Sequence, residues 1–262
     1  MSGLTLRAAG LFGIVFIAMS TNAQAEDEVS AISWSTGIEY STGTYGGTED
    51  IEDTYVPVTV RIRTERAAFE LTVPYLSVTA PAGTTITDPG NQPVPGSGPT
   101  VTESGMGDII AGATLYDVLY SDALGMALDL TGKIKFGTAD KDKGLGTGEQ
   151  DFTVRADVYK FFEQFTLMGS AGYKFRGDPA DVDLDNVILG SIGGALTVTD
   201  DTRIGLMFDY RESAIAESDD VSELSAFLAH NWNDTWHMQL YAFSGFTDSS
   251  ADWGVGILFE IS

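Results

Sequence analysis

The sequence contains no cysteine, few basic residues and no apolar run long enough for a membrane helix. Its 262 residues include 14 Lys and Arg against 38 Asp and Glu, which gives a formal net charge of −24. Such an acidic chain argues against nucleic acid and anionic surfaces as partners, because like charges repel. Without cysteine, no disulfide can hold the fold together, so another source of stability is needed.

The longest apolar run lies at the N-terminus and has the features of a Sec-type signal peptide. Arg7 provides the positive charge, Ala8–Met19 the apolar stretch, and Ala23–Ala25 an A-x-A cleavage site before Glu26. About a dozen apolar residues are too few to span a bilayer. We therefore predict a signal peptide over residues 1–25 and one domain over residues 26–262.

Apolar and polar residues alternate with period two in about twelve segments, which indicates β-strands. In the segment 124–137, for example, Leu128 and Leu130 fall on one face, and Asp129 and Lys133 on the other. The predicted strands are Val29–Thr42, Thr54–Thr64, Ala67–Thr79, Gly105–Tyr116, Leu124–Gly137, Gln150–Phe161, Phe165–Arg176, Asn186–Thr199, Thr202–Glu212, Val221–Trp232, Thr235–Thr247 and Asp252–Ile261.

Three features favour a membrane barrel over a soluble β-sandwich. Most segments have the length that a tilted strand needs to cross a bilayer, whereas strands of globular proteins average about 5–6 residues. Aromatic residues such as Trp34, Tyr116, Trp232 and Trp253 gather near the strand ends. Short connections alternate with long ones, as periplasmic turns alternate with extracellular loops.

The predicted fold is therefore all-β: a closed antiparallel transmembrane β-barrel of about 12 strands, with ten and fourteen as the neighbouring counts. Closure follows because lipid offers no partner to a free backbone N–H or C=O group. The expected location is the outer membrane of a Gram-negative cell. The expected partners are its lipid bilayer, the outer-membrane assembly machinery and a small-molecule solute.

Charged residues on the inward face are the candidate functional residues. Nine basic and nine acidic side chains point inward in the predicted register, so the lumen is roughly neutral and the excess acid lies in the loops. Two interpretations stay open: a wet pore, or an interior filled by salt bridges. The predicted pore-lining residues are Arg61, Arg63, Asp129, Lys133, Lys135, Arg155, Lys174, Arg176, Asp209 and Arg211. Among these, the basic residues of the outer half are expected to face Asp129 and Asp209 and to act on a passing solute, as charged rings do in channels.

Enzyme and metal chemistry find little support in the sequence. The two histidines, His230 and His237, have no serine nucleophile motif beside them, so we predict no catalytic residues, no enzyme activity and no cofactor. Asp181, Asp183 and Asp185 resemble the start of a calcium loop, but the later bidentate Glu is missing. We interpret them as a solvated acidic loop and predict no metal site.

Prolines mark two further places. The loop 81–103 holds five of the eight prolines, and it either folds into the mouth of the barrel or lies outside it. Pro57 and Pro74 fall within predicted strands, where proline cannot donate to the ladder. They predict either a plain bulge or a local break between strands that opens laterally for apolar solutes.

Three short motifs resemble those of a barrel family named for the meta-cleavage pathway of phenol degradation. They are Gly105-Met106-Gly107-Asp108, Lys135-Phe136-Gly137-Thr138, and Gly144-Leu145-Gly146-Thr147-Gly148 with Asp151. The family usually has Pro-Thr-Gly after the strand that ends in Lys, and Gly137-Thr138-Ala139 stands here instead. The resemblance implies an outer-membrane channel for aromatic or other hydrophobic compounds.

The sequence thus predicts a porin-like transporter for passive uptake of small organic solutes, including hydrophobic or aromatic ones. The alternative is a structural or adhesive barrel whose acidic extracellular loops bind a partner, without transport.

Overall fold

The computed structural model describes residues 5–11, 14–20, 31–89, 91–180, 182–216 and 218–262. Within these residues the only helix is the single turn η1 (Lys141–Lys143), and no helix there has the length and apolar character to span a bilayer. The main sheet consists of β3 (Ala31–Gly43), β4 (Ile51–Arg63), β5 (Ala67–Pro81), β8 (Thr100–Met106), β9 (Ile110–Ser121), β10 (Met126–Lys135), β11 (Asp151–Phe161), β12 (Phe165–Phe175), β13 (Val187–Thr199), β14 (Thr202–Arg211), β15 (Val221–Asn231), β16 (Trp236–Gly245) and β17 (Trp253–Ile261).

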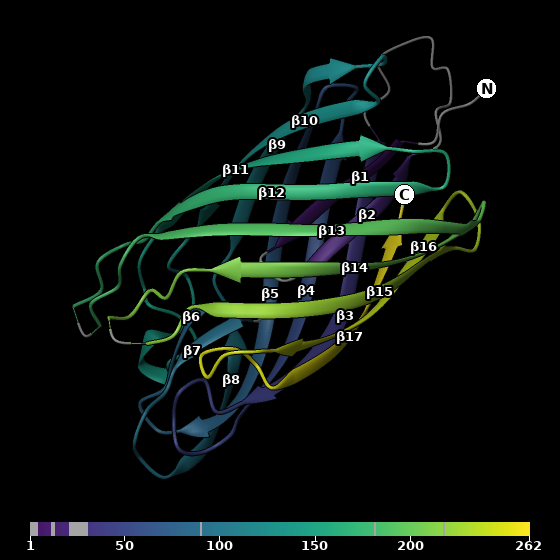
Figure 1. Ribbon diagram of the computed structural model, residues 1–262. Helices are drawn as coiled ribbons and strands as arrows, with labels where there is room; N and C mark the ends of the chain where they lie inside the picture. The colour runs from purple at the N-terminus through teal and green to yellow at the C-terminus, as the bar shows by residue number, and fades with distance from the viewer. Residues whose placement is uncertain (1–4, 12–13, 21–30, 90, 181, 217) are drawn as a thin grey trace.

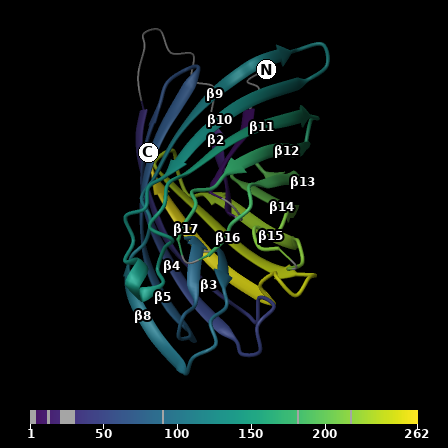
Figure 2. The same ribbon diagram turned by 90° about the vertical axis from the view of Figure 1, so that its left-hand side faces the viewer.

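This sheet closes into an antiparallel barrel (Figures 1 and 2). From β9 to β17 and from β3 to β5, each strand pairs with the next one in the chain, and β17 pairs with β3 to complete the ring. β8 and β9 both pair with β5 and occupy one position in the wall, so the barrel has twelve strand positions. The prediction of a closed twelve-stranded barrel is confirmed.

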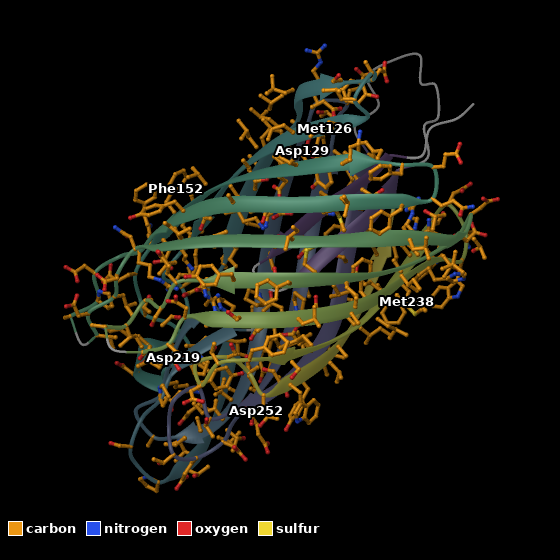
Figure 3. All side chains as sticks on the ribbon, viewed as in Figure 1. Met126, Asp129, Phe152, Asp219, Met238 and Asp252 are labelled. Carbon is orange, nitrogen blue, oxygen red and sulfur yellow. The ribbon has the colours of Figure 1, made fainter. Side chains whose placement is uncertain are left out.

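The two faces of the wall differ as the alternation predicts. On β10, Leu130 and Ile134 are 40% and 38% exposed, whereas the residues directly before them, Asp129 and Lys133, are buried. Side chains cover the outside of the barrel in Figure 3, where Phe152 lies on its outline. A continuous apolar outer surface is stable only against lipid. The strands therefore span a membrane, and their alternate residues face the lumen.

Short turns and long loops lie at opposite ends of the barrel. In Figure 1 the C-terminus lies at the short-turn end, which faces the periplasm, and β6 and β7 lie toward the loop end. The fourth predicted strand differs most from the structure. It consists of β8 and β9, and β9 continues to Ser121 through the residues expected to form a connection at 117–123. A bulge at Asp117 permits this: its φ is +51°, and its N–H donates to Asp129 Oδ1 at 2.8 Å.

Pro57 and Pro74 face each other across β4 and β5, and the pairing between these two strands is unbroken. The pairing is interrupted instead on the other side of each strand, between β4 and β3 and between β5 and its second neighbour. β3 and β4 lack the pairs at Gly37 and Ile38, opposite Pro57. β5 changes partner from β9 to β8 beside Pro74, whose carbonyl accepts from Gly107 N at 2.9 Å. The prediction of a break between the two prolines is therefore wrong. The N–H groups that proline lacks would have bonded to β3 and to the β8–β9 side, not across the β4–β5 pair. A lateral opening beside them stays a prediction.

Two small hairpins lie outside the main sheet. β1 (Thr5–Leu11) and β2 (Ile14–Ser20) pair only with each other, and they fall in the predicted signal peptide, whose removal stays a prediction. β6 (Thr85–Asp88) and β7 (Asn91–Val94) form the second hairpin, within the proline-rich loop. Thr87, Asp88 and Ile86 are all buried, so this loop folds inward rather than lying outside.

Candidate functional site in the barrel lumen

The inward-folded loop is held by a group of buried charges near the mouth, here called the Asp88 cluster. It comprises Asp88, Asp108, Lys135, Asp151, Lys174 and Arg176. Asp88 pairs with Lys174, and its Oδ2 accepts from Arg176 Nη2 at 3.0 Å. Asp151 Oδ2 lies 3.2 Å from Lys174 Nζ and 3.3 Å from Lys135 Nζ. Burial by itself would raise the pKa of Asp88, but the cations around it outweigh that effect and hold its pKa below the ordinary carboxyl value.

The three motifs that carried the family resemblance meet at this cluster. Lys135 Nζ lies 3.1 Å from Asp108 Oδ2 and donates to Thr147 Oγ1 at 3.3 Å. The other carboxylate oxygen, Asp108 Oδ1, accepts from the backbone N–H groups of Thr138 and Ala139 at 2.9 and 2.8 Å. The three motifs come from separate segments, and together they hold the loop 138–150 at Thr138, Ala139 and Thr147.

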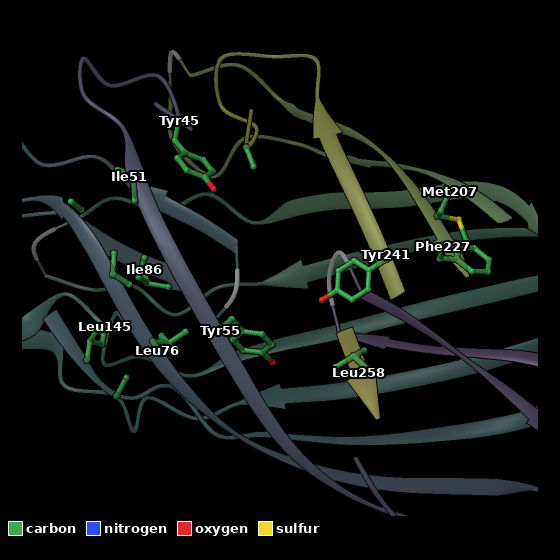
Figure 4. Packing of buried hydrophobic residues seen from close by; sticks show 14 of the residues in the cluster. Tyr45, Ile51, Tyr55, Leu76, Ile86, Leu145, Met207, Phe227, Tyr241 and Leu258 are labelled. Carbon is green, nitrogen blue, oxygen red and sulfur yellow. The ribbon is translucent and has the colours of Figure 1, made fainter. Parts of the chain in front are cut away.

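The β6–β7 hairpin also touches the loops around it. Ile86 N donates to Gly144 O at 2.8 Å, and Lys135 Nζ donates to Thr87 O at 3.1 Å. In Figure 4, Ile86 lies near Ile51 and Leu76, with which it belongs to one buried apolar cluster. The hairpin therefore has one apolar anchor and one charged anchor at the loop end of the barrel.

A second group of buried charges, the Arg61 cluster, crosses the lumen-facing side of the wall. It comprises Arg61, Glu70, Lys133 and Glu260. Arg61 and Lys133 both lie 3.1 Å from Glu70, and Arg61 lies 3.6 Å from Glu260. Salt bridges thus join β4, β5, β10 and β17 inside the barrel. In both clusters, buried cations are compensated by carboxylates, as burial of charge requires.

The remaining predicted pore-lining residues also lie on the lumen face, although their role in a pore stays a prediction. Arg155 lies 3.0 Å from Asp157, and Arg211 is buried at the end of β14. Arg63 follows Arg61 by two residues and shares its face. Arg211 interacts electrostatically with Asp209, in line with the expected opposition. The salt bridges of Lys133, Lys135, Lys174 and Arg176 go to Glu70, Asp88, Asp108 and Asp151, and the expected opposition of these four to Asp129 and Asp209 stays a prediction.

Acidic and tyrosine side chains gather on another part of the lumen face, the Glu39 cluster. It comprises Glu39, Asp53, Tyr55 and Tyr241, all of them buried. Tyr241 donates its hydroxyl to Glu39 Oε2 at 2.6 Å. Asp53 Oδ1 and the Tyr55 hydroxyl have no hydrogen-bond partner among the described residues. The nearby loop residue Tyr45 is buried, which raises its pKa, and the negative charges of this region add to the rise.

Large apolar side chains also face the lumen, which the charge-based prediction missed. This inner apolar belt consists of Tyr159, Met168, Met207, Phe227, Tyr241 and Leu258, one from each strand β11, β12, β14, β15, β16 and β17, and every one is buried. Figure 4 shows Met207, Phe227, Tyr241 and Leu258.

Glycines on the adjacent strands make room for the belt. A Cβ added at Gly205 would lie 2.3 Å from Phe227 Cζ, and one at Gly256 would lie 2.2 Å from Tyr241 Cζ. The rings therefore lie flat against glycine backbone instead of projecting across the lumen. The high glycine content of these strands is the sequence signal that points to this arrangement.

Only part of the acidic loop that resembles the start of a calcium loop lies within the described residues. Asp181 lies outside the described residues, and Asp183 and Asp185 are exposed. Asn186 Oδ1 accepts from Arg176 N at 2.8 Å. Among the described residues, no three His, Cys, Asp or Glu side chains are placed to hold a metal ion.

One hydrogen-bonded series has the order of a catalytic triad. His237 Nε2 lies 3.1 Å from Ser262 Oγ, and His237 Nδ1 lies 2.8 Å from Asn231 Oδ1. Ser262 lies 25 residues from His237 in the chain, so no local motif joins the two. However, Ser262 Oγ also lies 3.2 Å from Asp234 O, to which it can donate. This carbonyl competes with His237 for the single proton of the serine hydroxyl. A general base must take that proton for nucleophilic attack, so this geometry gives little support to hydrolysis. His230 contacts Thr202 Oγ1 at 2.9 Å.

Comparison with known proteins agrees with the barrel and its motifs. The family described as "Putative MetA-pathway of phenol degradation" matches residues 13–260. No curated protein matches the chain by sequence. Among solved structures, the COG4313 outer membrane channel from Pseudomonas putida F1 is 13% identical, with a TM-score of 0.70 over 92% of this chain and 98% of that one.

Two porin structures resemble the fold more distantly. The KdgM porin is 9% identical, with a TM-score of 0.54 over 88% of this chain and 98% of that one. The NanC porin is 7% identical, with a TM-score of 0.56 over 88% of this chain and 100% of that one. At these identities the likeness concerns the fold alone, which is that of outer-membrane channels. With a family match that spans nearly its whole length, this outer-membrane barrel belongs to the family described as "Putative MetA-pathway of phenol degradation".

Proposed function

We propose that the chain is a channel for passive uptake of small organic solutes with an apolar or aromatic body. The inner apolar belt is the observation that carries this proposal. Six large apolar side chains line consecutive or nearly consecutive strands on the face of the barrel where water and polar solutes would otherwise be expected. Once the side chains packed over the belt move aside, its surface stabilises an apolar solute in transit, because contact removes apolar area from water.

The charged clusters on the same face complement the belt. They keep the rest of the lumen polar, so the apolar surface is limited to one part of the wall. A limited apolar surface binds a solute weakly enough to release it, which conduction requires. The family description refers to phenol degradation, and the Pseudomonas putida protein of the same fold is an outer membrane channel, which together support a channel connected with aromatic compounds.

The test compares two solutes that differ only in their apolar group. Phenyl-β-D-glucoside and methyl-β-D-glucoside share a sugar that prevents free passage through lipid, and liposome swelling reports their entry through the purified barrel. The wild-type barrel is expected to favour the phenyl compound. In Phe227→Ser the ratio of phenyl to methyl glucoside entry is expected to fall severalfold. The phenyl group then loses apolar contact with the Phe227 ring, and such contact contributes about 25 cal/mol per Å².

The matched control is Leu228→Ser, which changes the next residue of β15 on the lipid-facing side, where Leu228 is 36% exposed. This variant is expected to keep the wild-type preference. Equal entry of the two glucosides through the wild-type barrel would contradict the proposal. The proposal would also be contradicted if the two serine substitutions changed the ratio of the two glucoside entry rates equally.

A further inference from the structure

Two buried carboxyl groups of the Glu39 cluster have no basic partner. Glu39 and Asp53 lie on the lumen face of β3 and β4, where they are 3% and 5% exposed. Among the described residues, no Lys or Arg side chain forms a salt bridge with either of them. The carboxyl groups of the Asp88 and Arg61 clusters, by contrast, each have at least one salt bridge. In the Glu39 cluster, buried acid is therefore not balanced by buried base.

The strand register brings the polar groups of this cluster into two adjacent rows. Tyr241 and Glu39 flank one glycine of β17, and Glu39 pairs directly with Tyr55 of β4. In the next row toward the loops, Ser41 pairs with Asp53. Residues two apart on a strand share a face, and Cβ atoms of directly paired residues are about 4.5–5.5 Å apart. The polar groups of the cluster therefore surround one place on the lumen side of the wall.

Two buried polar atoms of the cluster have no partner. Asp53 Oδ1 and the Tyr55 hydroxyl make no hydrogen bond within the part of the chain that the structure describes. Figure 4 shows the hydroxyl groups of Tyr55 and Tyr241 pointing toward each other from β4 and β16. The Tyr241 hydroxyl donates to Glu39 Oε2. A buried polar atom without a partner is destabilising, so the cluster gains stability from a ligand that supplies hydrogen bonds.

The charges around the cluster indicate that such a ligand is a cation. The charges of Asp53 and Glu223 both act on Glu39, and no basic group of the described residues does so. A buried negative charge is stabilised when an opposite charge pairs with it. An ammonium group carries three N–H donors and no acceptor, which suits carboxylate oxygens and the oxygen of a tyrosine hydroxyl. The chemistry of the cluster therefore matches an ammonium group.

The position of Tyr241 favours an organic ammonium over an inorganic ion. Its hydroxyl belongs to the Glu39 cluster, while its ring lies against Gly256 and is part of the inner apolar belt. Phe227, another belt residue, pairs with Tyr241 across β15 and β16. A solute with an ammonium group on an aromatic body gains from both surfaces, and tyrosine rings also attract cations. An alkali ion gains only from the charged end.

A solute reaches this place once the side chains packed over it move aside, because the cluster is buried. Tyr45 lies on the loop side, in the connection between β3 and β4, and is itself buried. Its hydroxyl lies 3.4 Å from Ser41 Oγ, which is long for a hydrogen bond between hydroxyl groups. The tip of the Tyr45 side chain is therefore held weakly on the side from which a solute arrives.

We propose that the Glu39 cluster binds the ammonium group of a solute whose apolar body lies along the inner apolar belt. Glu39 and Asp53 supply the negative charge, and the Tyr55 hydroxyl oxygen accepts one N–H of the ligand. The inference rests on the proposed function, an uptake channel for solutes with an apolar or aromatic body. It adds cationic amines with an aromatic body as a class of solute.

The first experiment measures binding to the purified barrel by isothermal titration calorimetry. The probes are benzylammonium and benzyl alcohol, which share the ring and its methylene group and differ in charge. The wild-type barrel is expected to bind benzylammonium at least tenfold more tightly than benzyl alcohol. Asp53→Asn is expected to weaken benzylammonium binding at least tenfold and to leave benzyl alcohol unchanged. Tyr55→Phe, which removes only the hydroxyl, is expected to weaken benzylammonium binding severalfold.

Asp157→Asn is the matched control, because it makes the same substitution at another buried, lumen-facing carboxylate. Asp157 pairs with Arg155 and is not part of the Glu39 cluster. This variant is expected to bind benzylammonium as wild type does. Equal affinity of the wild-type barrel for the two probes would overturn the proposal. An equal loss of benzylammonium affinity in Asp53→Asn and Asp157→Asn would overturn it too, because the effect would then come from the net charge of the lumen.

The second experiment uses only the wild-type barrel, so it does not depend on the folding of a variant. A ligand that binds only the folded state raises the melting temperature. Benzylammonium chloride is expected to raise the melting temperature of the barrel in micelles above that in potassium chloride at the same concentration, and benzyl alcohol is not. Equal melting temperatures in the two chlorides would show that the aromatic amine has no site of its own and would overturn the proposal.

The glucoside test and these experiments fail in different ways. Selective entry of the phenyl glucoside without benzylammonium binding would remove the ammonium site and leave the proposed function standing. Equal entry of the two glucosides with selective benzylammonium binding would remove the preference for neutral aromatic solutes and leave the ammonium site standing.

Discussion

Gly256 on β17 offers the sharpest test of how the lumen is kept clear. A Cβ at this position would lie 2.2 Å from Tyr241 Cζ and 2.3 Å from the Tyr241 hydroxyl oxygen. Gly256→Ala therefore forces the ring away from the wall or strains the backbone beneath it. The same hydroxyl donates to Glu39 Oε2 at 2.6 Å, so a displaced ring also loses this hydrogen bond.

The size of the effect follows from these contacts. Overpacking a well-packed site costs about 1–3 kcal/mol, and a hydrogen bond contributes about 0.5–1.5 kcal/mol. The ring either stays and is strained, or moves and loses the hydrogen bond, so these costs are alternatives. We expect Gly256→Ala to lower the free energy of unfolding by about 0.5–3 kcal/mol.

Gly132 provides the control, because a Cβ added there meets no atom within 4 Å. Gly132→Ala is expected to raise the free energy of unfolding by about 0.5–1 kcal/mol, since glycine is the costlier residue in a strand. The two Gly→Ala substitutions thus have opposite signs. Guanidinium titration of the barrel in micelles, followed by tryptophan fluorescence, measures both.

A double-mutant cycle with Tyr241→Ala tests the cause. Without the ring, Gly256→Ala is expected to be neutral or stabilising, as at Gly132. If Gly256→Ala destabilises the barrel equally with and without the Tyr241 ring, the steric explanation is refuted.

Two further predictions concern the loop end and the periplasmic end of the barrel. The pKa of Asp88 lies below the ordinary carboxyl value of about 3.9. The ion pairs of Asp88 therefore stabilise the fold fully above about pH 3.9, and this stabilisation is lost only as the pH falls through the lowered pKa. Bilayer conductance is therefore expected to be the same at pH 7 and pH 4, and a rise with a midpoint near pH 5 would contradict the assignment of Asp88 as a paired carboxylate. At the other end, Ser262→Ala and His237→Ala are expected to leave hydrolysis of p-nitrophenyl butyrate at the rate of the wild-type barrel, and a rate that disappears in both variants would instead reveal a working triad.

Local alternation was enough to predict most of the wall. The boundaries of β5, β11 and β12 agree with the predicted segments within two residues, because each residue in a strand between lipid and lumen meets one of two very different surroundings. The fourth segment was harder to place. Its glycines carry no alternation, and the bulge at Asp117 shifts the register, so its division into β8 and β9 and its extension to Ser121 were not predictable.

For the candidate site, too, one part was predictable from the sequence and another part was not. The sequence placed the basic residues on the lumen face, and Lys135, Lys174 and Arg211 are indeed buried there. It did not give their partners, because Asp88 comes from a loop whose path depends on contacts with other loops. The apolar belt was also missed, because large apolar residues at inward positions were obscured by glycine-rich neighbours.

The sequence by itself therefore determined that the chain is a barrel in lipid and which residues of most strands face inward. Those properties depend on hydrophobicity at spacing two, which is a local quantity. Only the tertiary structure decided that the β6–β7 hairpin folds into the mouth, that Asp88 pairs with Lys174 and Arg176, and that Phe227 and Tyr241 lie over glycines. Those contacts join residues from different strands and loops, and their energies exist only once the ring has closed.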